Sequence, residues 1–480
     1  MRRLPSASWI DQVRRVAMQT VDHDTATARD CKTIVCDGWH AFAAVVESPA
    51  GCRADDGGQG GRHRRALGAL SSMAKLETPK VANRPLDIGK PASLADANPP
   101  NATIGPFLLL FGLLYAAFGA ASPFLPALME ARGLPAEQIG ILFGTATAIR
   151  LISAPIAGRI ADRTQALRAT LAVCAVATAL AAMGYLSAWG FWALLAVGLL
   201  HALALAPTTN LADALAVVAS RMQGFEYGWV RGAGSAAFIA ASLMAGMAVS
   251  TFGLGVVVVL QAMLMLAVPF ATALVPPVAR LDPKPEKLSR EGILALARLP
   301  VFRRVVLVAA MVLGSHALHD TFSVIRWTNA GISPQAASML WSLAVAAEVV
   351  IFFVVGPWVL DRLGPARAIA IAAIAGAARW VISALTLDLA AIMLIQPLHG
   401  VTFALLHLAC MRLLASTVPT ELAATGQAVY GTVGVGAASA LLTLASGWLY
   451  AGLGAHAFLV MSGLCLAALP VALALRHADR

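Results

Sequence analysis

Long apolar segments follow one another from residue 105 almost to residue 475, and few folds accommodate such a pattern. Each segment holds about 20 to 27 residues, enough for a tilted helix to cross about 30 Å of hydrocarbon. Because hydrophobic residues make up 59% of the chain and charged residues only 12%, an ordinary soluble fold is excluded. We therefore predict an all-α membrane protein with twelve transmembrane helices. They are expected at 105–129, 138–160, 168–187, 191–217, 228–251, 254–276, 303–326, 336–360, 367–386, 390–412, 425–450 and 455–475.

The predicted helices fall into two similar halves. The longest polar break, residues 279–304, separates the first six helices from the last six. The dipeptide Asp162-Arg163 returns 199 positions later as Asp361-Arg362, which indicates a parallel internal repeat. We predict two pseudo-symmetric six-helix bundles, at 105–276 and 303–475, joined by a cytoplasmic loop at 277–302, with a substrate held between them.

Basic residues predict the orientation. Sixteen Lys and Arg residues fall on one set of alternate loops, against only Arg132 and Arg326 on the other. Because basic loops stay in the cytoplasm, both termini should be cytoplasmic in a bacterial-type inner (plasma) membrane that the chain crosses many times. The net charge of +10 then reflects these loops, and no nucleic-acid partner is expected.

Residues 1–100 show no sustained hydrophobic period, and we predict a disordered cytoplasmic extension without an assigned function. An alternative of comparable weight is that the natural start is Met73. The six cysteines form no CxxC motif and no His-spaced ligand set, so neither a metal, a cofactor nor a disulfide framework is expected.

Two opposite charges interrupt the apolar segments around 220–226. Asp213 and Arg231 are each nine residues from Met222, the centre of this polar turn, so they should lie at one depth in the membrane. A lone charge at mid-bilayer costs about 2.5 to 3.5 kcal/mol or more, which favours a pair. We predict a substrate-binding pair; the alternative is a purely structural pair that joins two helices.

Further charged side chains lie within other predicted helices. Arg150 has no acid within a turn of its own helix, and we expect it to face the cavity and bind an anionic group such as a carboxylate. Glu348 is either a proton carrier or a structural acid bonded to a neighbouring helix. Arg379 and His399 are each ten residues from Leu389, in the middle of a short turn, and should also share one depth.

The segment GSHALHDTF (314–322) carries His316, His319 and Asp320. A metal site or an acyl-transfer motif would need further ligands or a coenzyme-binding element that the sequence does not offer. We therefore expect a polar face lining the pore, with Asp320 protonated or paired. Candidate apolar walls of the binding site are Phe118, Phe322, Trp341 and Phe403.

Several motifs resemble the major facilitator superfamily. FEYGWVRGAG (225–234), with an acid 18 residues before its arginine, is similar to the helix 4 to helix 5 hairpin of lactose permease and its relatives. GRIADRTQALR (158–168) resembles the cytoplasmic signature of the superfamily, although Gln165 replaces its second glycine, and DRLGPAR (361–367) is its counterpart in the second half. The resemblance implies a cytoplasmic gate formed by Gly158, Asp162, Arg163, Asp361 and Arg362.

Across 105–475 the chain is similar to the 3-phenylpropionate permease branch, through GSHA (314–317), LWSLAVAAEVVIFF (340–353), LHGVTFALLHLA (398–409) and QAVYG (427–431). The lactose permease resemblance implies that Arg379 and His399 take part in proton coupling. Thr402 stands where that family has an essential glutamate, so the proton carrier should be Glu348, Asp213 or Asp320. Phe238 replaces a substrate-facing tryptophan and should still offer a ring to the substrate.

These observations predict a proton-coupled symporter of a small organic solute that works by alternating access. The preferred substrate is an aromatic or aliphatic monocarboxylate such as 3-phenylpropionate, with protons and the lipid bilayer as the other partners and a monomer as the functional unit. Alternatives within transport are a sugar or nucleoside symporter and a drug exporter. An enzyme is not expected, and a non-transporting membrane sensor or scaffold would have little reason to keep the buried charges.

Overall fold

The computed structural model describes residues 101–277 and 290–475, and all regular secondary structure in these two ranges is helical. The predicted extension at 1–100 lies outside the described residues, as does most of the predicted loop at 277–302. Both stay predictions.

The first half consists of seven helices. They are α3 (Asn101–Ala121), α4 (Leu125–Ala131), α5 (Ala136–Thr164), α6 (Leu167–Ser187), α7 (Phe191–Gln223), α8 (Tyr227–Phe252) and α9 (Val256–Leu274). Glycines end several of them, because a left-handed residue closes a helix without steric cost; Gly224 after α7 has φ 72°. Gln165 after α5 has φ 53° and is the only described residue other than glycine with a positive φ.

The helices of the second half are shorter and more often interrupted. It contains α10 (Arg290–Arg298), α11 (Pro300–Val312), α12 (His316–Asn329), α13 (Pro334–Val350), α14 (Gly356–Leu363), α15 (Pro365–Leu385), α16 (Leu389–Ile395), α17 (Leu398–Gly400), α18 (Leu406–Thr417), α19 (Ala423–Val429), α20 (Ala438–Leu453) and α21 (Ala457–Leu473). Three π-helical segments connect some of these helices: η2 (Ile351–Val355), η3 (Val401–Leu405) and η5 (Tyr430–Ala437). Such wide turns are often found at functional sites.

Eleven helical stretches of the described residues are long and apolar enough to cross a membrane. The difference from the predicted twelve arises in the last stretch, Thr420–Leu473, which contains both segments expected at 425–450 and 455–475. The short 3-10 turn Gly454–His456 joins α20 to α21 without a gap, and Gly454, with φ 54°, ends α20. The count of twelve and the orientation of the termini stay predictions.

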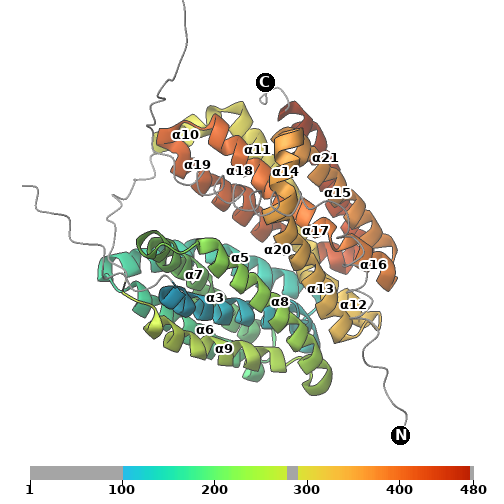
Figure 1. The fold of residues 1–480 in the computed structure, drawn as a ribbon. Helices are drawn as coiled ribbons and strands as arrows, with labels where there is room; N and C mark the ends of the chain where they lie inside the picture. The colour runs from blue at the N-terminus through green and yellow to red at the C-terminus, as the bar shows by residue number, and fades with distance from the viewer. Residues whose placement is uncertain (1–100, 278–289, 476–480) are drawn as a thin grey trace, which may run out of the picture.

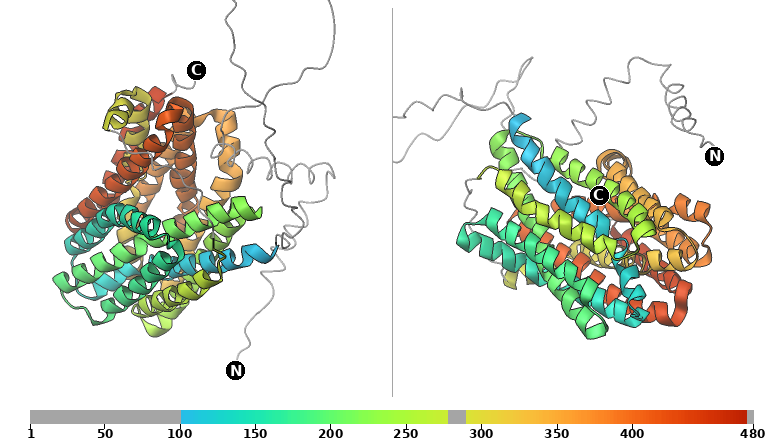
Figure 2. Two further views of the ribbon diagram at one scale, coloured as in Figure 1. Left: turned by 90° about the vertical axis from the view of Figure 1, so that its left-hand side faces the viewer. Right: turned by 90° about the horizontal axis from the view of Figure 1, so that it is seen from below.

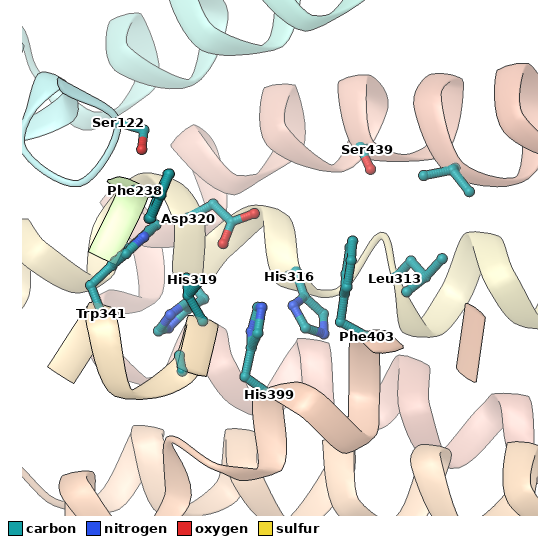
Figure 3. A pocket seen from close by; sticks show the side chains of 13 residues that line it. Ser122, Phe238, Leu313, His316, His319, Asp320, Trp341, His399, Phe403 and Ser439 are labelled. Carbon is teal, nitrogen blue, oxygen red and sulfur yellow. The ribbon is translucent and has the colours of Figure 1, made fainter. Parts of the chain in front are cut away.

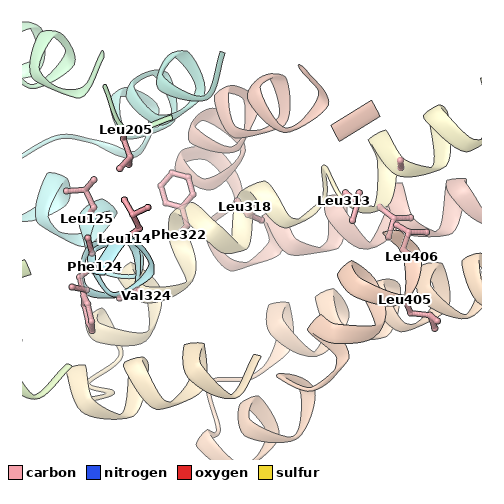
Figure 4. Packing of buried hydrophobic residues seen from close by; sticks show 14 of the residues in the cluster. Leu114, Phe124, Leu125, Leu205, Leu313, Leu318, Phe322, Val324, Leu405 and Leu406 are labelled. Carbon is pink, nitrogen blue, oxygen red and sulfur yellow. The ribbon is translucent and has the colours of Figure 1, made fainter. Parts of the chain in front are cut away.

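The two halves form separate bundles that meet along a few helices (Figures 1 and 2). The pairs in contact across the boundary include α5 with α20, α8 with α13 and α12 with α4. Figure 4 shows Phe322 and Val324 of α12 and Leu125 of α4, which all belong to a buried apolar cluster that extends through both halves.

Close backbone contacts join the halves at one end of the helices. A Cβ on Gly140 of α5 would lie 2.6 Å from the Cα of Gly447 of α20, so only glycine allows this approach. Asn329 at the end of α12 donates a hydrogen bond to Glu130 at the end of α4, at 3.0 Å. All four residues lie toward the side opposite the arginine-rich loops. The two halves are therefore in direct contact on that side.

Candidate functional site

A pocket of about 240 Å³ lies between the two halves (Figure 3). The first half contributes two side chains to its wall, and the second half contributes the others, from α11 through α13, α17, η3, η5 and α20. The lining residues are Ser122, Phe238, Leu313, His316, His319, Asp320, Trp341, Ala344, Val345, His399, Phe403, Val435 and Ser439. The pocket thus combines aromatic rings with a small set of polar groups, as ligand sites commonly do.

The break between α11 and α12 brings the polar residues of 314–322 to this pocket. The chain turns at Gly314, and α12 starts at His316, with Asp320 four residues later on the same helical face. Asp320 is exposed and faces the pocket. No hydrogen bond or ion pair joins its carboxyl to another described residue. His316, His319 and Asp320 thus lie together at the pocket, and within the described range Asp320 is unpaired. That this polar face lines the transport path stays a prediction.

Arg379 of α15 organises the polar groups behind the pocket. It is fully buried and donates from Nη1 to Nδ1 of His399 and from Nη2 to Nε2 of His319, both at 3.2 Å. Nη2 also donates to Gln396 at 3.4 Å, and the guanidinium lies 4.5 Å from the ring of Trp380. The expected proximity of Arg379 and His399 is confirmed.

These contacts determine the tautomers of two histidines. An arginine can only donate, so Nδ1 of His399 and Nε2 of His319 must both accept and carry no proton. The remaining proton of neutral His319 is then on Nδ1, where it is donated to Ser323 at 2.7 Å. That of His399 is on Nε2, which lies 3.6 Å from Glu348 of α13. Both rings are therefore neutral while they contact Arg379. The contacts of Arg379 with His399 and of His399 with Glu348 connect three helices, α15, α17 and α13.

His316 differs from the other two histidines. Only 4% of it is exposed, and neither ring nitrogen has a hydrogen-bond partner among the described residues. Its ring instead packs against rings, with centroids 4.9 Å from His399, 5.3 Å from Trp380 and 6.2 Å from Phe403. A buried N–H without a partner is costly, so His316 needs a partner that the described residues do not supply.

Asp213 and Arg231 are not joined by an ion pair in the described residues. The hydroxyl of Tyr227 donates to Asp213 at 2.7 Å, whereas the guanidinium of Arg231 lies 4.6 Å from the ring of Tyr115. Nη1 of Arg231 is buried without a partner, and the acid that interacts with this arginine electrostatically is Glu348 of the other half. The pairing inferred from equal depth is therefore wrong. Asp213 instead accepts a hydrogen bond from Tyr227, the residue that directly follows the polar turn at 220–226.

The two arginines expected to bind substrate do not line the pocket. Arg150 is an exposed residue of α5 that interacts electrostatically with Tyr185 and His201, and its side chain has no hydrogen bond or ion pair with a described residue. Phe238 does line the pocket, together with Trp341 and Phe403. Of the other expected walls, Phe322 is instead buried and stacked on Tyr450 at 4.5 Å.

The residues of the expected cytoplasmic gate lie at the ends of α5 and α14. Asp361 forms an ion pair with Arg412 at 2.6 Å, and Arg362 lies 4.6 Å from the ring of Trp358. A Cβ on Gly158 would meet no atom within 4 Å, so no helix packs closely against it here. The contacts of Asp361 and Arg362 thus stay within their own half, and a role in gating stays a prediction.

Among the described residues no three His, Cys, Asp or Glu side chains form a group that could hold a metal ion. Sequence reasoning missed Ser122 and Ser439 of the pocket, because a single serine in an apolar helix carries no signal. It also missed the partners Tyr115 and Tyr227. Tyr227 lies one helical turn before Arg231 and could have been considered, whereas Tyr115 belongs to the distant helix α3.

Comparison with known proteins gives a consistent picture. Residues 107–460 match the model of the "MFS_1 like family". A protein of Escherichia coli (strain K12) named "Probable 3-phenylpropionic acid transporter" is 33% identical over 74% of this chain and 93% of its own length. The "Maltose permease" of Geobacillus stearothermophilus is 24% identical over 72% of this chain and 86% of its own. The crystal structure of the nucleoside transporter NupG superimposes with a TM-score of 0.69 at 17% identity, over 77% of this chain and 98% of NupG.

Proposed function

Because the chain belongs to the MFS_1-like family of the major facilitator superfamily, whose members are multi-pass membrane transporters, we propose that it is a proton-coupled symporter of a small monocarboxylate such as 3-phenylpropionate. The pocket between the halves is the observation that carries the proposal. A volume of about 240 Å³ suits a small molecule, and residues of both halves line it, as alternating access requires.

The chemistry of the pocket supports an aromatic acid. Phe238 from the first half and Trp341 and Phe403 from the second provide faces and edges for a phenyl ring. His316 and Asp320 provide polar groups within the same cavity. The relative from Escherichia coli is named a probable 3-phenylpropionic acid transporter, which is the same substrate class.

Proton coupling is proposed for Glu348, Arg379, His399 and Asp320. Support comes from the contacts that connect Arg379 to His399 and His399 to Glu348, and from the lack of any GxxxxGK[ST] nucleotide-binding motif in the sequence. We place Arg231 near the path of the anion, because one of its nitrogens has no partner and it interacts with Glu348 across the boundary.

The test is transport by the full chain in proteoliposomes under an imposed pH gradient, with a panel of labelled carboxylates, sugars and nucleosides. We expect 3-phenylpropionate to accumulate and the accumulation to vanish when ionophores remove both the pH and the voltage gradients. Uptake of maltose or a nucleoside in its place would refute the carboxylate assignment. Accumulation that survives ionophores but needs sodium would refute proton symport.

A further inference from the structure

The pocket contains one acid that no described residue neutralises by contact. The carboxyl of Asp320 is exposed to the cavity and has neither a hydrogen bond nor an ion pair within the described ranges. One helical turn earlier on α12, His316 carries two buried nitrogens without partners. Figure 3 shows both side chains at the same pocket, with Phe403 and Trp341 nearby.

The other charged and titratable groups around Asp320 are already engaged. Arg379 of α15 and Glu348 of α13 both act on Asp320 electrostatically. The guanidinium of Arg379 donates hydrogen bonds to two histidines and a glutamine. Glu348 contacts His399 of α17. On α12 itself, His319 is held between Arg379 and a serine. Among the titratable groups that line the pocket, Asp320 and His316 are therefore the ones that remain available to a ligand.

An anionic substrate could not share this small cavity with an ionised Asp320. Two carboxylates at close range repel each other strongly where water is largely excluded, and such pairs hold a proton between them. A neutral Asp320, by contrast, offers an O–H that can donate to a carboxylate oxygen. Hydrogen bonds of this O–H···O⁻ kind are among the strongest in proteins.

Building on the proposed carboxylate transport, we propose that protonated Asp320 and an N–H of His316 bind the substrate carboxylate directly, so that each anion enters the pocket together with one proton. The proton stays on the carboxyl of Asp320, or is shared with the substrate, while the anion is bound. When the anion leaves toward the cytoplasm, Asp320 loses its proton to the same side. Coupling then arises from contact between substrate and acid, and Glu348 with His399 positions this region and carries no proton of its own.

The inference is tested by isothermal titration calorimetry of the purified full chain. Titrations with 3-phenylpropionate in buffers of different ionisation enthalpy report how many protons are taken up on binding, and 3-phenylpropionamide serves as the uncharged control. In the wild type we expect uptake of about one proton per anion at pH values where free Asp320 is ionised, and over the same pH range the affinity should fall about tenfold per pH unit. The amide should bind with no proton uptake.

Two variants locate the proton. Asp320→Asn keeps the shape of the neutral carboxyl, so it should bind the acid without proton uptake and with an affinity independent of pH. Glu348→Gln should still take up about one proton per anion, even where its affinity falls, because Glu348 only positions this region. Proton uptake that persists in Asp320→Asn, or disappears in Glu348→Gln, overturns the proposal.

The titration of the wild type alone also tests the proposal, even if a variant does not fold. Binding of the acid without proton uptake overturns direct coupling by Asp320 and leaves the proposed carboxylate transport intact. A wild type that binds the amide or a sugar but never the acid overturns both proposals.

Discussion

Gly400 controls how closely α13 and α17 approach beside the Glu348–His399 contact. A Cβ at position 400 would lie 2.6 Å from the carbonyl oxygen of Ala347 and 2.9 Å from Cγ1 of Ile351. An ordinary Cβ contact needs about 3.4 Å or more, so in Gly400→Ala the two helices must separate by roughly 0.8 Å. The contact of 3.6 Å between Nε2 of His399 and the carboxyl of Glu348 would then lengthen by a similar amount and be lost.

The cost follows from two opposing terms. Overpacking of this size costs about 1 to 3 kcal/mol, whereas alanine is favoured over glycine within a helix by about 0.5 to 1 kcal/mol. We therefore expect Gly400→Ala to lower the free energy of unfolding by about 0 to 2.5 kcal/mol. The larger effect should be on proton-driven accumulation, because Glu348 loses its partner.

Gly431→Ala is a matched control, because a Cβ at position 431 would meet no atom within 4 Å. Thermal unfolding in detergent and uptake into proteoliposomes are measured for both variants. The control should be as stable as the wild type or more stable, with normal accumulation. If Gly400→Ala matches Gly431→Ala in both measurements, the reasoning about close helix approach is wrong.

Three further outcomes follow from the contacts of single residues. The stability effects of Asp213→Ala and Arg231→Ala should add in the double variant, since Tyr227 and not the arginine is the partner of the acid; a coupling energy above about 1 kcal/mol in a double-mutant cycle would contradict this. Arg379→Lys keeps the charge but loses the planar guanidinium that donates to two histidines at once, so accumulation should fall while the protein still reaches the membrane. Accumulation at the wild-type level would show that these two hydrogen bonds are not needed for transport. Gln165→Gly should raise the unfolding free energy by about 1 kcal/mol, as measured by thermal unfolding, because it removes a non-glycine residue from the left-handed region; a loss of stability would show that the hydrogen bond from Gln165 to Asp162 matters more.

Local sequence patterns predicted the elements of this fold well. Apolar length alone located the membrane segments, because in a bilayer a helix must satisfy its own backbone and must match the hydrocarbon thickness. The spacing of Arg379 and His399 about a turn likewise placed two side chains side by side, since two antiparallel helices bring residues at equal distance from their turn to the same depth. The same reasoning failed for Asp213 and Arg231, because depth says nothing about which way each helix face points.

By itself, the sequence determined that this chain is an all-helical membrane protein, and it predicted two repeated halves. It also identified the polar residues that a membrane would not tolerate without a purpose. Only the tertiary structure decided which of them meet. Asp320 lies unpaired at a pocket, His316 keeps two buried nitrogens free, and Arg379 orders two histidines, whereas Arg150 lies apart. The reason is physical: hydropathy is a property of each segment, but the rotation of a helix about its axis is decided by packing against helices that are distant in sequence.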